Sequence, residues 1–164
     1  MQGIKDAGSG RTRLAGKLLE VAPRDQVPRS FSLSSLQGGQ LALSDLRGKV
    51  VLLNFWATWC PPCIEEMPSM VQLFDKMKGD PRFAMVAIST DESWDPVQRF
   101  FANTKPGFTV LLDPKGQLAK EYGTTMFPET YVVIDGVVRG FIEGPRRWDT
   151  WYAEAYLRGL LDEG

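Results

Sequence analysis

The sequence predicts an α/β domain in which helices flank a mixed central β-sheet. A continuous β-branched and aromatic run, Val50 to Trp56, is typical of a strand buried on both faces. Directly after it, apolar residues at spacings of three and four from Pro61 to Met77 indicate a helix. Strand and helix patterns then alternate until two strands meet at Asp135-Gly136, a strong hairpin turn, so the sheet has a parallel and an antiparallel half.

The chain before the first long strand divides into two parts. Residues 1–30 contain scattered glycine, proline and basic side chains with little periodicity, and we expect a flexible lead-in with at most one helical turn between Leu14 and Val21. We expect the folded domain over residues 31–164. It begins with a β-hairpin, because Gly38-Gly39 separates two short apolar runs and supplies the positive φ angles of a tight turn.

The remaining elements follow from their periodicity and from the residues that interrupt it. After the long helix we expect a strand at Phe83–Ser89, a helix at Ser93–Asn103, a strand at Phe108–Leu112, a short helix at Gln117–Tyr122, the strand pair Thr130–Ile134 and Val137–Ile142, and a closing helix at Trp148–Leu161. The aromatic residues of the closing helix are expected to pack against the sheet, or alternatively to form a ligand-binding patch: Trp148, Trp151, Tyr152 and Tyr156. The preceding pair Arg146-Arg147 is expected to be solvated.

Composition excludes several classes of function. With 19 basic and 20 acidic residues the formal charge is −1, which gives no indication of a nucleic-acid partner. There is no histidine, so Ser-His-Asp and Cys-His catalytic pairs and a His-ligated haem are excluded. Two cysteines are too few for a tetrahedral Cys/His zinc site within one chain, and we expect no metal. No apolar run approaches the roughly 20 residues of a membrane span, and we expect any export signal or anchor to be absent from this chain.

The chemistry of the chain is concentrated in Trp59-Cys60-Pro61-Pro62-Cys63, which follows the buried strand and opens the long helix. Residues i and i+3 share a helix face, so the second thiol can reach a mixed disulfide formed by the first. The helix N-terminus favours a thiolate at Cys60. A Cys60–Cys63 bridge closes too short a loop to stabilise the fold, so we expect a redox-active disulfide and no other cofactor. The alternatives are half of a zinc site shared between chains, or two buried structural thiols.

A glutamate one turn into the same helix is the candidate proton acceptor for Cys63. At about 100° per residue, the apolar face centres near Met67 and Phe74; Glu65 points away from it, whereas Glu66 falls at its margin, three residues after Cys63. The alternative is that Glu66 is a solvated first-turn carboxylate stabilised by the helix dipole.

The run Asn54-Phe55-Trp56-Ala57-Thr58-Trp59-Cys60-Pro61-Pro62-Cys63, followed by Glu65-Glu66-Met67-Pro68, resembles the thioredoxin superfamily. Within it, the chain is most similar to the extracytoplasmic bacterial thiol-disulfide oxidoreductases of the TlpA/ResA kind. The resemblance extends from about Val27 to the C-terminus and implies a thioredoxin-like fold with an N-terminal β-hairpin and a mid-domain helical insertion at Ser93–Gly107. The motif Pro128-Glu129-Thr130 also resembles the CcmG/DsbE branch of cytochrome c maturation, and both branches remain open.

The resemblance assigns roles to residues around the dithiol. It implies that Pro128 is cis and lies against the Cys-x-x-Cys motif, and that Phe127 offers its backbone to a substrate strand; the alternative is an ordinary trans proline at the start of a strand. Trp59 is expected at the surface, in a docking rim with Pro61 and Pro62, while Trp56 is expected in the core.

The resemblance also bears on the two polar residues near the motif. Glu66 matches the active-site glutamate of ResA-like proteins. Asn54 stands where classical thioredoxins have an acid, so no proton relay passes through that position, although the amide can hydrogen-bond locally.

These inferences predict a thiol-disulfide oxidoreductase in which Cys60 attacks, Cys63 resolves and Glu66 manages the proton of Cys63. We expect a periplasmic or otherwise extracytoplasmic monomer that acts on protein disulfides and is reduced by an upstream thiol-disulfide donor, which can be membrane-bound. Because Pro62 has no N–H, only the amide of Cys63 is expected to stabilise a thiolate at Cys60, which favours the reductase direction. The alternatives are a copper-delivery module, although the histidine ligand of such proteins is missing here, and a peroxide-reducing redoxin on the same scaffold.

Overall fold

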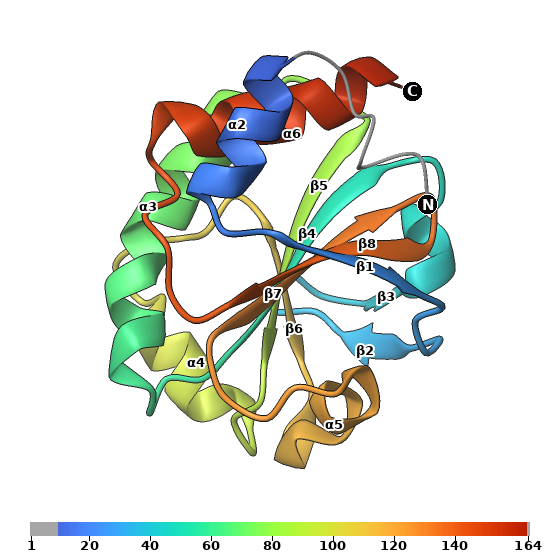
Figure 1. The fold of residues 1–164 in the computed structure, drawn as a ribbon. Helices are drawn as coiled ribbons and strands as arrows, with labels where there is room; N and C mark the ends of the chain where they lie inside the picture. Colours follow the sequence, from blue (N-terminus) through green and yellow to red (C-terminus); the bar gives the residue numbers. More distant parts are fainter. Residues whose placement is uncertain (1–9, 164) are drawn as a thin grey trace.

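A computed structural model describes residues 10–163, and its main feature is a six-stranded mixed sheet (Figure 1). In spatial order the strands are β1 (Ala22–Gln26), β8 (Val137–Glu143), β7 (Glu129–Ile134), β4 (Val50–Trp56), β5 (Phe83–Ser89) and β6 (Thr109–Leu112). The β4, β5 and β6 strands are parallel to one another, whereas β7 is antiparallel to both β4 and β8. The predicted mixed sheet is therefore confirmed, with its parallel and antiparallel halves meeting at β4.

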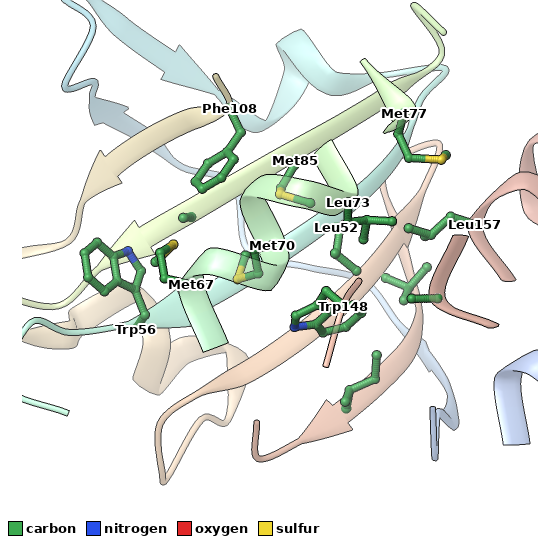
Figure 2. Packing of buried hydrophobic residues seen from close by; sticks show 14 of the residues in the cluster. Leu52, Trp56, Met67, Met70, Leu73, Met77, Met85, Phe108, Trp148 and Leu157 are labelled. Carbon is green, nitrogen blue, oxygen red and sulfur yellow. The ribbon is translucent and has the colours of Figure 1, made fainter. Parts of the chain in front are cut away.

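The central strand β4 places alternate side chains in two hydrophobic clusters, which explains its uninterrupted apolar sequence. On one face, Leu52 and Trp56 pack with the helices α3 (Pro61–Met77) and α6 (Trp151–Glu163) (Figure 2). On the other face, Leu53 and Phe55 pack with the short helix α5 (Gln117–Tyr122) and with residues beside the hairpin of β2 (Ser32–Ser34) and β3 (Gln40–Ala42).

Most of the predicted elements are present, with small differences at their ends. The N-terminal hairpin, α3 and α5 are confirmed, and Asp135 and Gly136 adopt the expected positive φ angles of 48° and 79° in the β7–β8 turn. The mid-domain helix α4 (Trp94–Phe100) ends three residues earlier than predicted, ahead of the breaker pair Pro106-Gly107. Two short 3₁₀ turns, η1 (Leu43–Leu46) and η2 (Pro114–Gly116), complete the described chain.

The prediction of a flexible lead-in is wrong for residues 10–26. Helix α2 (Gly10–Leu18) lies across α6 in Figure 1, and β1 adds an edge strand to the sheet beside β8. The contact between the two helices uses small residues: Gly16 lies under the ring of Tyr156, and Gly159 lies over Thr12. Small side chains and a polar edge strand give little hydrophobic periodicity, so the pattern that indicates a folded element is weak here. Residues 1–9 of the predicted lead-in lie outside the described residues.

The closing helix also differs from its prediction. It begins at Trp151, and Trp151 does not pack against the sheet: it is 49 % exposed, and the guanidinium of Arg11 lies 4.8 Å from its ring centroid. Tyr152 and Tyr156 do contact the core, as predicted. Over residues 10–163, no helix has both the length and the apolar character needed to cross a membrane.

Candidate active site

The two cysteines lie where the carboxyl end of β4 meets the N-terminus of α3, and they form a disulfide. Cys60 is the N-cap residue of α3, and its Sγ accepts the backbone N–H of Cys63 at 3.3 Å. Because Pro61 and Pro62 occupy the first two helical positions and have no N–H, this amide is the first that the helix can offer. Cys60 is 5 % exposed and Cys63 1 %, the predicted order of accessibility.

A second segment closes over the disulfide from the start of β7. The Phe127–Pro128 peptide bond is cis, as the resemblance implied, and the carbonyl oxygen of Phe127 lies 3.5 Å from Cys60 Sγ. The register of β7 against β4 pairs Glu129 with Phe55, which places the residues just before β7 at the carboxyl end of β4. We call residues 124–128 the docking loop. It forms one wall of the dithiol site.

Exposed apolar side chains surround this buried disulfide. Trp59 is 63 % exposed, and its ring meets that of Phe127 edge-on with the centroids 5.8 Å apart. The exposed residues form what we call the apolar rim: Trp59, Pro61, Pro62, Ile64 and Met126. Exposed apolar patches mark sites of protein contact. The sequence predicted the first three members; Ile64 and Met126 were missed because nothing in a single apolar residue distinguishes a rim from a core position. Trp56 is fully buried as expected, beside Phe100 and Phe101.

Glu66 is buried behind the dithiol, so the alternative of a solvated first-turn carboxylate is wrong. Its side chain is 3 % exposed and accepts three hydrogen bonds: from Trp148 Nε1 at 2.7 Å, from the Arg146 backbone N–H at 3.1 Å and from Asn54 Nδ2 at 3.3 Å. Burial raises the pKa of Glu66 from the ordinary 4.5 to about 7, although each of these hydrogen bonds lowers it. A carboxyl group with a pKa near 7, one helical turn from Cys63, is suited to accept and return a proton at neutral pH.

Two of these hydrogen-bond partners were not found from the sequence. Trp148 was assigned to helix packing, yet it precedes α6 and is fully buried with its indole N–H directed at Glu66. Arg146 was expected to be solvated, but its guanidinium donates to the carbonyl oxygen of Leu19 at 2.7 Å and contacts Glu20 at 3.3 Å. Only its neighbour Arg147 is an exposed side chain, paired with Asp149. These contacts join residues about 80 or more positions apart, which no local pattern predicts.

Asn54 forms the local hydrogen bonds that were expected of it. Besides Glu66, its Nδ2 donates to Thr130 Oγ1 at 2.9 Å, so it links the central strand, α3 and β7. Asn54 is a neutral donor at the position where classical thioredoxins have an acid. The titratable group beside it is Glu66, which accepts its hydrogen bond.

A second buried carboxyl group, Glu129, follows the cis proline. Burial raises its pKa, while hydrogen bonds from the Thr124 hydroxyl and the Thr125 backbone N–H lower it. Glu129 is 2 % exposed and stands at the start of β7, directly after the docking loop. Among residues 10–163 there is no group of three or more His, Cys, Asp or Glu side chains placed to hold a metal ion.

A Cys-x-x-Cys disulfide at a strand–helix junction, faced by a cis proline, defines a dithiol-disulfide oxidoreductase with a thioredoxin-like fold. A family model described as the AhpC/TSA family matches residues 23–141. The chain is 36 % identical over 132 residues to the thiol-disulfide oxidoreductase ResA of Bacillus thuringiensis subsp. konkukian (strain 97-27), covering 80 % of this chain and 75 % of ResA. It is 41 % identical over 127 residues to the thioredoxin-like protein YneN of Bacillus subtilis (strain 168), covering 75 % and 72 % of the two chains.

Solved structures agree with these sequence relatives. A structure from Chlorobium tepidum that carries the name DsbE superposes with a TM-score of 0.73 at 34 % identity, covering 85 % of this chain and 99 % of that one. StoA of Bacillus subtilis superposes with a TM-score of 0.64 at 26 % identity, covering 74 % and 92 %. The chain belongs to the AhpC/TSA family, and within it to the ResA-like thiol-disulfide oxidoreductases. The predicted fold and enzyme class are confirmed.

Proposed function

We propose that the protein works as a reductant of disulfides in exported proteins, with Cys60 as the nucleophile. The observation that carries this proposal is the pairing of a dithiol, whose outer sulfur lies against the docking loop, with a buried carboxyl group of pKa about 7 behind its inner sulfur. The apolar rim around Cys60 supports a protein as the substrate, because it offers contact area beyond the reacting atoms.

The reaction consumes a reduced dithiol and a substrate disulfide. The Cys60 thiolate attacks one substrate sulfur, a Cys60–substrate S–S bond forms, and the other substrate sulfur leaves as a thiolate that takes up a proton. Glu66 then accepts the proton of Cys63, whose sulfur attacks Cys60 Sγ. The Cys60–Cys63 disulfide forms and the second substrate thiol is released. Two electrons have passed to the substrate, and a thiol donor must return two electrons to the protein.

The surroundings of Cys60 support the direction in which the protein reduces its substrate. A strongly oxidising dithiol stabilises its nucleophilic thiolate, which makes the reduced form more favourable. Here the first helical turn supplies the single amide of Cys63, and the Phe127 carbonyl oxygen, 3.5 Å from the sulfur, is an acceptor that gives a thiolate no hydrogen bond. The two residues between the cysteines, Pro61 and Pro62, carry no charge that could stabilise a thiolate at Cys60.

The similarity to ResA and to the structure named DsbE supports an extracytoplasmic reaction. The resemblance of Pro128-Glu129-Thr130 to the CcmG/DsbE branch supports cytochrome c maturation as one setting for it. We further propose that the protein acts as a monomer and is re-reduced by a thiol-disulfide donor, which can be membrane-bound.

The reduction potential tests the direction. Equilibration of the protein with defined ratios of reduced and oxidised glutathione or dithiothreitol is expected to give a value nearer to about −270 mV than to about −120 mV. A potential at the oxidising end of that range would contradict a reductant. Peroxide consumption with a thiol donor, or a tight stoichiometric copper complex of the reduced protein, would instead favour the redoxin or copper-delivery alternatives.

A further inference from the structure

A surface pocket of about 350 Å³ lies beside the dithiol site, against the docking loop. Trp59 and Phe127, the aromatic pair of the site, line it, and so do Lys115, Lys120 and Glu92. Phe127 therefore belongs to both places: its carbonyl oxygen approaches Cys60 Sγ, and its other atoms face the pocket. A polypeptide bound along Phe127 at Cys60 therefore lies next to this pocket.

The walls of the pocket are fixed by buried carboxylates. Asp113 accepts the backbone N–H groups of Leu118 and Ala119, both at 3.0 Å, which joins η2 to the first turn of α5. Asp91 fixes the segment that carries Trp59, because its carboxylate accepts the N–H of Thr58 at 3.0 Å and the Thr58 hydroxyl at 2.7 Å. These bonds keep the lining residues in place without a ligand.

Lys115 has a backbone conformation that its side chain does not favour. Its φ of 67° and ψ of 7° lie in the left-handed region, where a residue with a Cβ is strained. Strained residues of this kind cluster at binding and catalytic sites, where the surrounding structure holds them. The strain here places a lysine, and not the more suitable glycine, at the wall of the pocket.

The charge of the pocket is positive although the whole chain carries a formal charge of −1. Lys115 and Lys120 are both exposed, and within residues 10–163 neither forms an ion pair. Glu92 is the acidic residue among those that line the pocket. Two ammonium groups face one carboxylate, so the pocket favours an anionic side chain.

We propose that this pocket, here called the lysine pocket, binds an acidic side chain of the disulfide substrate, two positions from the cysteine that Cys60 attacks. In an extended peptide, side chains two residues apart point to the same face and are separated by about 6–7 Å. A peptide that lies on Phe127 with its cysteine at Cys60 would, in this arrangement, direct the second side chain towards the pocket that Phe127 also lines. The inference rests on the proposed reductase function and adds a substrate class to it.

The test uses peptides that contain one internal disulfide and carry Glu or Gln two positions before the first cysteine or two positions after the second. Dithiothreitol at a fixed concentration regenerates the protein, and kcat/KM is measured for each peptide. The wild type is expected to prefer the Glu peptide over its Gln counterpart by about three- to tenfold in at least one of the two placements. The preference should fall towards one in about 0.5 M salt, because exposed charges are screened there.

Two substitutions assign the preference to the pocket. The double variant Lys115→Gln/Lys120→Gln is expected to lose the preference for Glu, and Lys115→Glu/Lys120→Glu should favour a peptide with Lys at that place. The matched control Lys76→Gln/Lys78→Gln removes the same charge at the far end of α3, roughly 25 Å along the helix, and should keep the wild-type preference.

Equal use of Glu and Gln peptides by the wild type, or an unchanged preference in the Lys115/Lys120 variants, would overturn the lysine pocket. A failure to reduce any of the peptides, the neutral ones included, would instead contradict the proposed reductase function, and the inference would fall with it.

Discussion

The substitution Glu66→Gln isolates the energetic cost of the buried carboxyl group. Glutamine keeps the size of the side chain and an acceptor oxygen for Trp148 Nε1, but it cannot ionise. In the wild type the pKa is about 7 in the folded protein against 4.5 as the ordinary value. At about 1.36 kcal/mol per pH unit, ionisation of the buried group lowers the free energy of unfolding by about 3 kcal/mol.

The direction in which folding shifts the pKa of Glu66 determines how stability changes with pH. Because folding raises the pKa of Glu66, the folded state favours the protonated form. The free energy of unfolding is therefore highest below about pH 4.5, falls as the pH rises from 4.5 to about 7, and is constant above that as far as this group is concerned. The Glu66→Gln variant has no ionisable group here, so its free energy of unfolding does not fall over this pH range for this reason. Its amide NH₂ replaces the oxygen that Asn54 Nδ2 contacts, and the cost of that clash, about 1 kcal/mol, does not depend on pH.

Urea unfolding of the disulfide form at pH 5 and pH 8.5 measures this difference, since the bridged cysteines do not titrate. The wild type should lose about 2.5 kcal/mol more than Glu66→Gln between the two pH values, since a small part of the loss has already occurred at pH 5. Glu65→Gln is the matched control, because Glu65 is the exposed neighbour on the same helix, and it should behave as the wild type does. An identical pH dependence in the wild type and Glu66→Gln would refute the reasoning.

The same substitution has a kinetic consequence. If Glu66 takes the proton of Cys63, the resolving step in Glu66→Gln should slow by at least about tenfold at neutral pH, and the inflection near pH 7 in the exchange rate should disappear. Slower exchange in Glu65→Gln but not in Glu66→Gln would transfer the role to the other glutamate.

Two further predictions concern residues that the sequence did not place. Gly159→Ala should destabilise the protein by about 1–3 kcal/mol and expose α2 to proteolysis, because a Cβ there collides with the side chain of Thr12, whereas Gly79→Ala, with no atom within 4 Å of the added Cβ, should be nearly neutral in thermal unfolding. Trp148→Phe removes the indole hydrogen bond that lowers the pKa of Glu66, so the inflection of the exchange rate should move upward by about one pH unit, and an unmoved inflection would contradict that contact.

The parts of the fold that could be predicted are those in which one periodicity is unambiguous. The strand Val50–Trp56 is apolar throughout because both of its faces are buried, and the helix Pro61–Met77 has one clear apolar face. Helix α2 was missed because Thr12, Ala15 and Gly16 make a close helix contact through small side chains, which hydrophobic patterns do not register.

The candidate site divides in the same way. Cys60, Cys63 and Glu66 follow one another at intervals of three residues, about one helical turn each, so their relative placement follows from helix geometry. Trp148 and Arg146 follow β8, and they reach Glu66 because β8 pairs with β7 and β7 pairs with β4. Sequence reasoning therefore identified the reacting groups, while the residues that set the pKa of Glu66 required the tertiary structure.

The central claim is that Cys60 makes the covalent bond to substrate and Cys63 breaks it. Mass spectrometry of reduced Cys63→Ser, incubated with a disulfide peptide, tests this most directly. We predict a stable adduct of one peptide on Cys60, no adduct in Cys60→Ser, and no accumulation in the wild type, where Cys63 releases the peptide. An adduct that forms on Cys63 in Cys60→Ser at a comparable rate, or no adduct in Cys63→Ser, would contradict it.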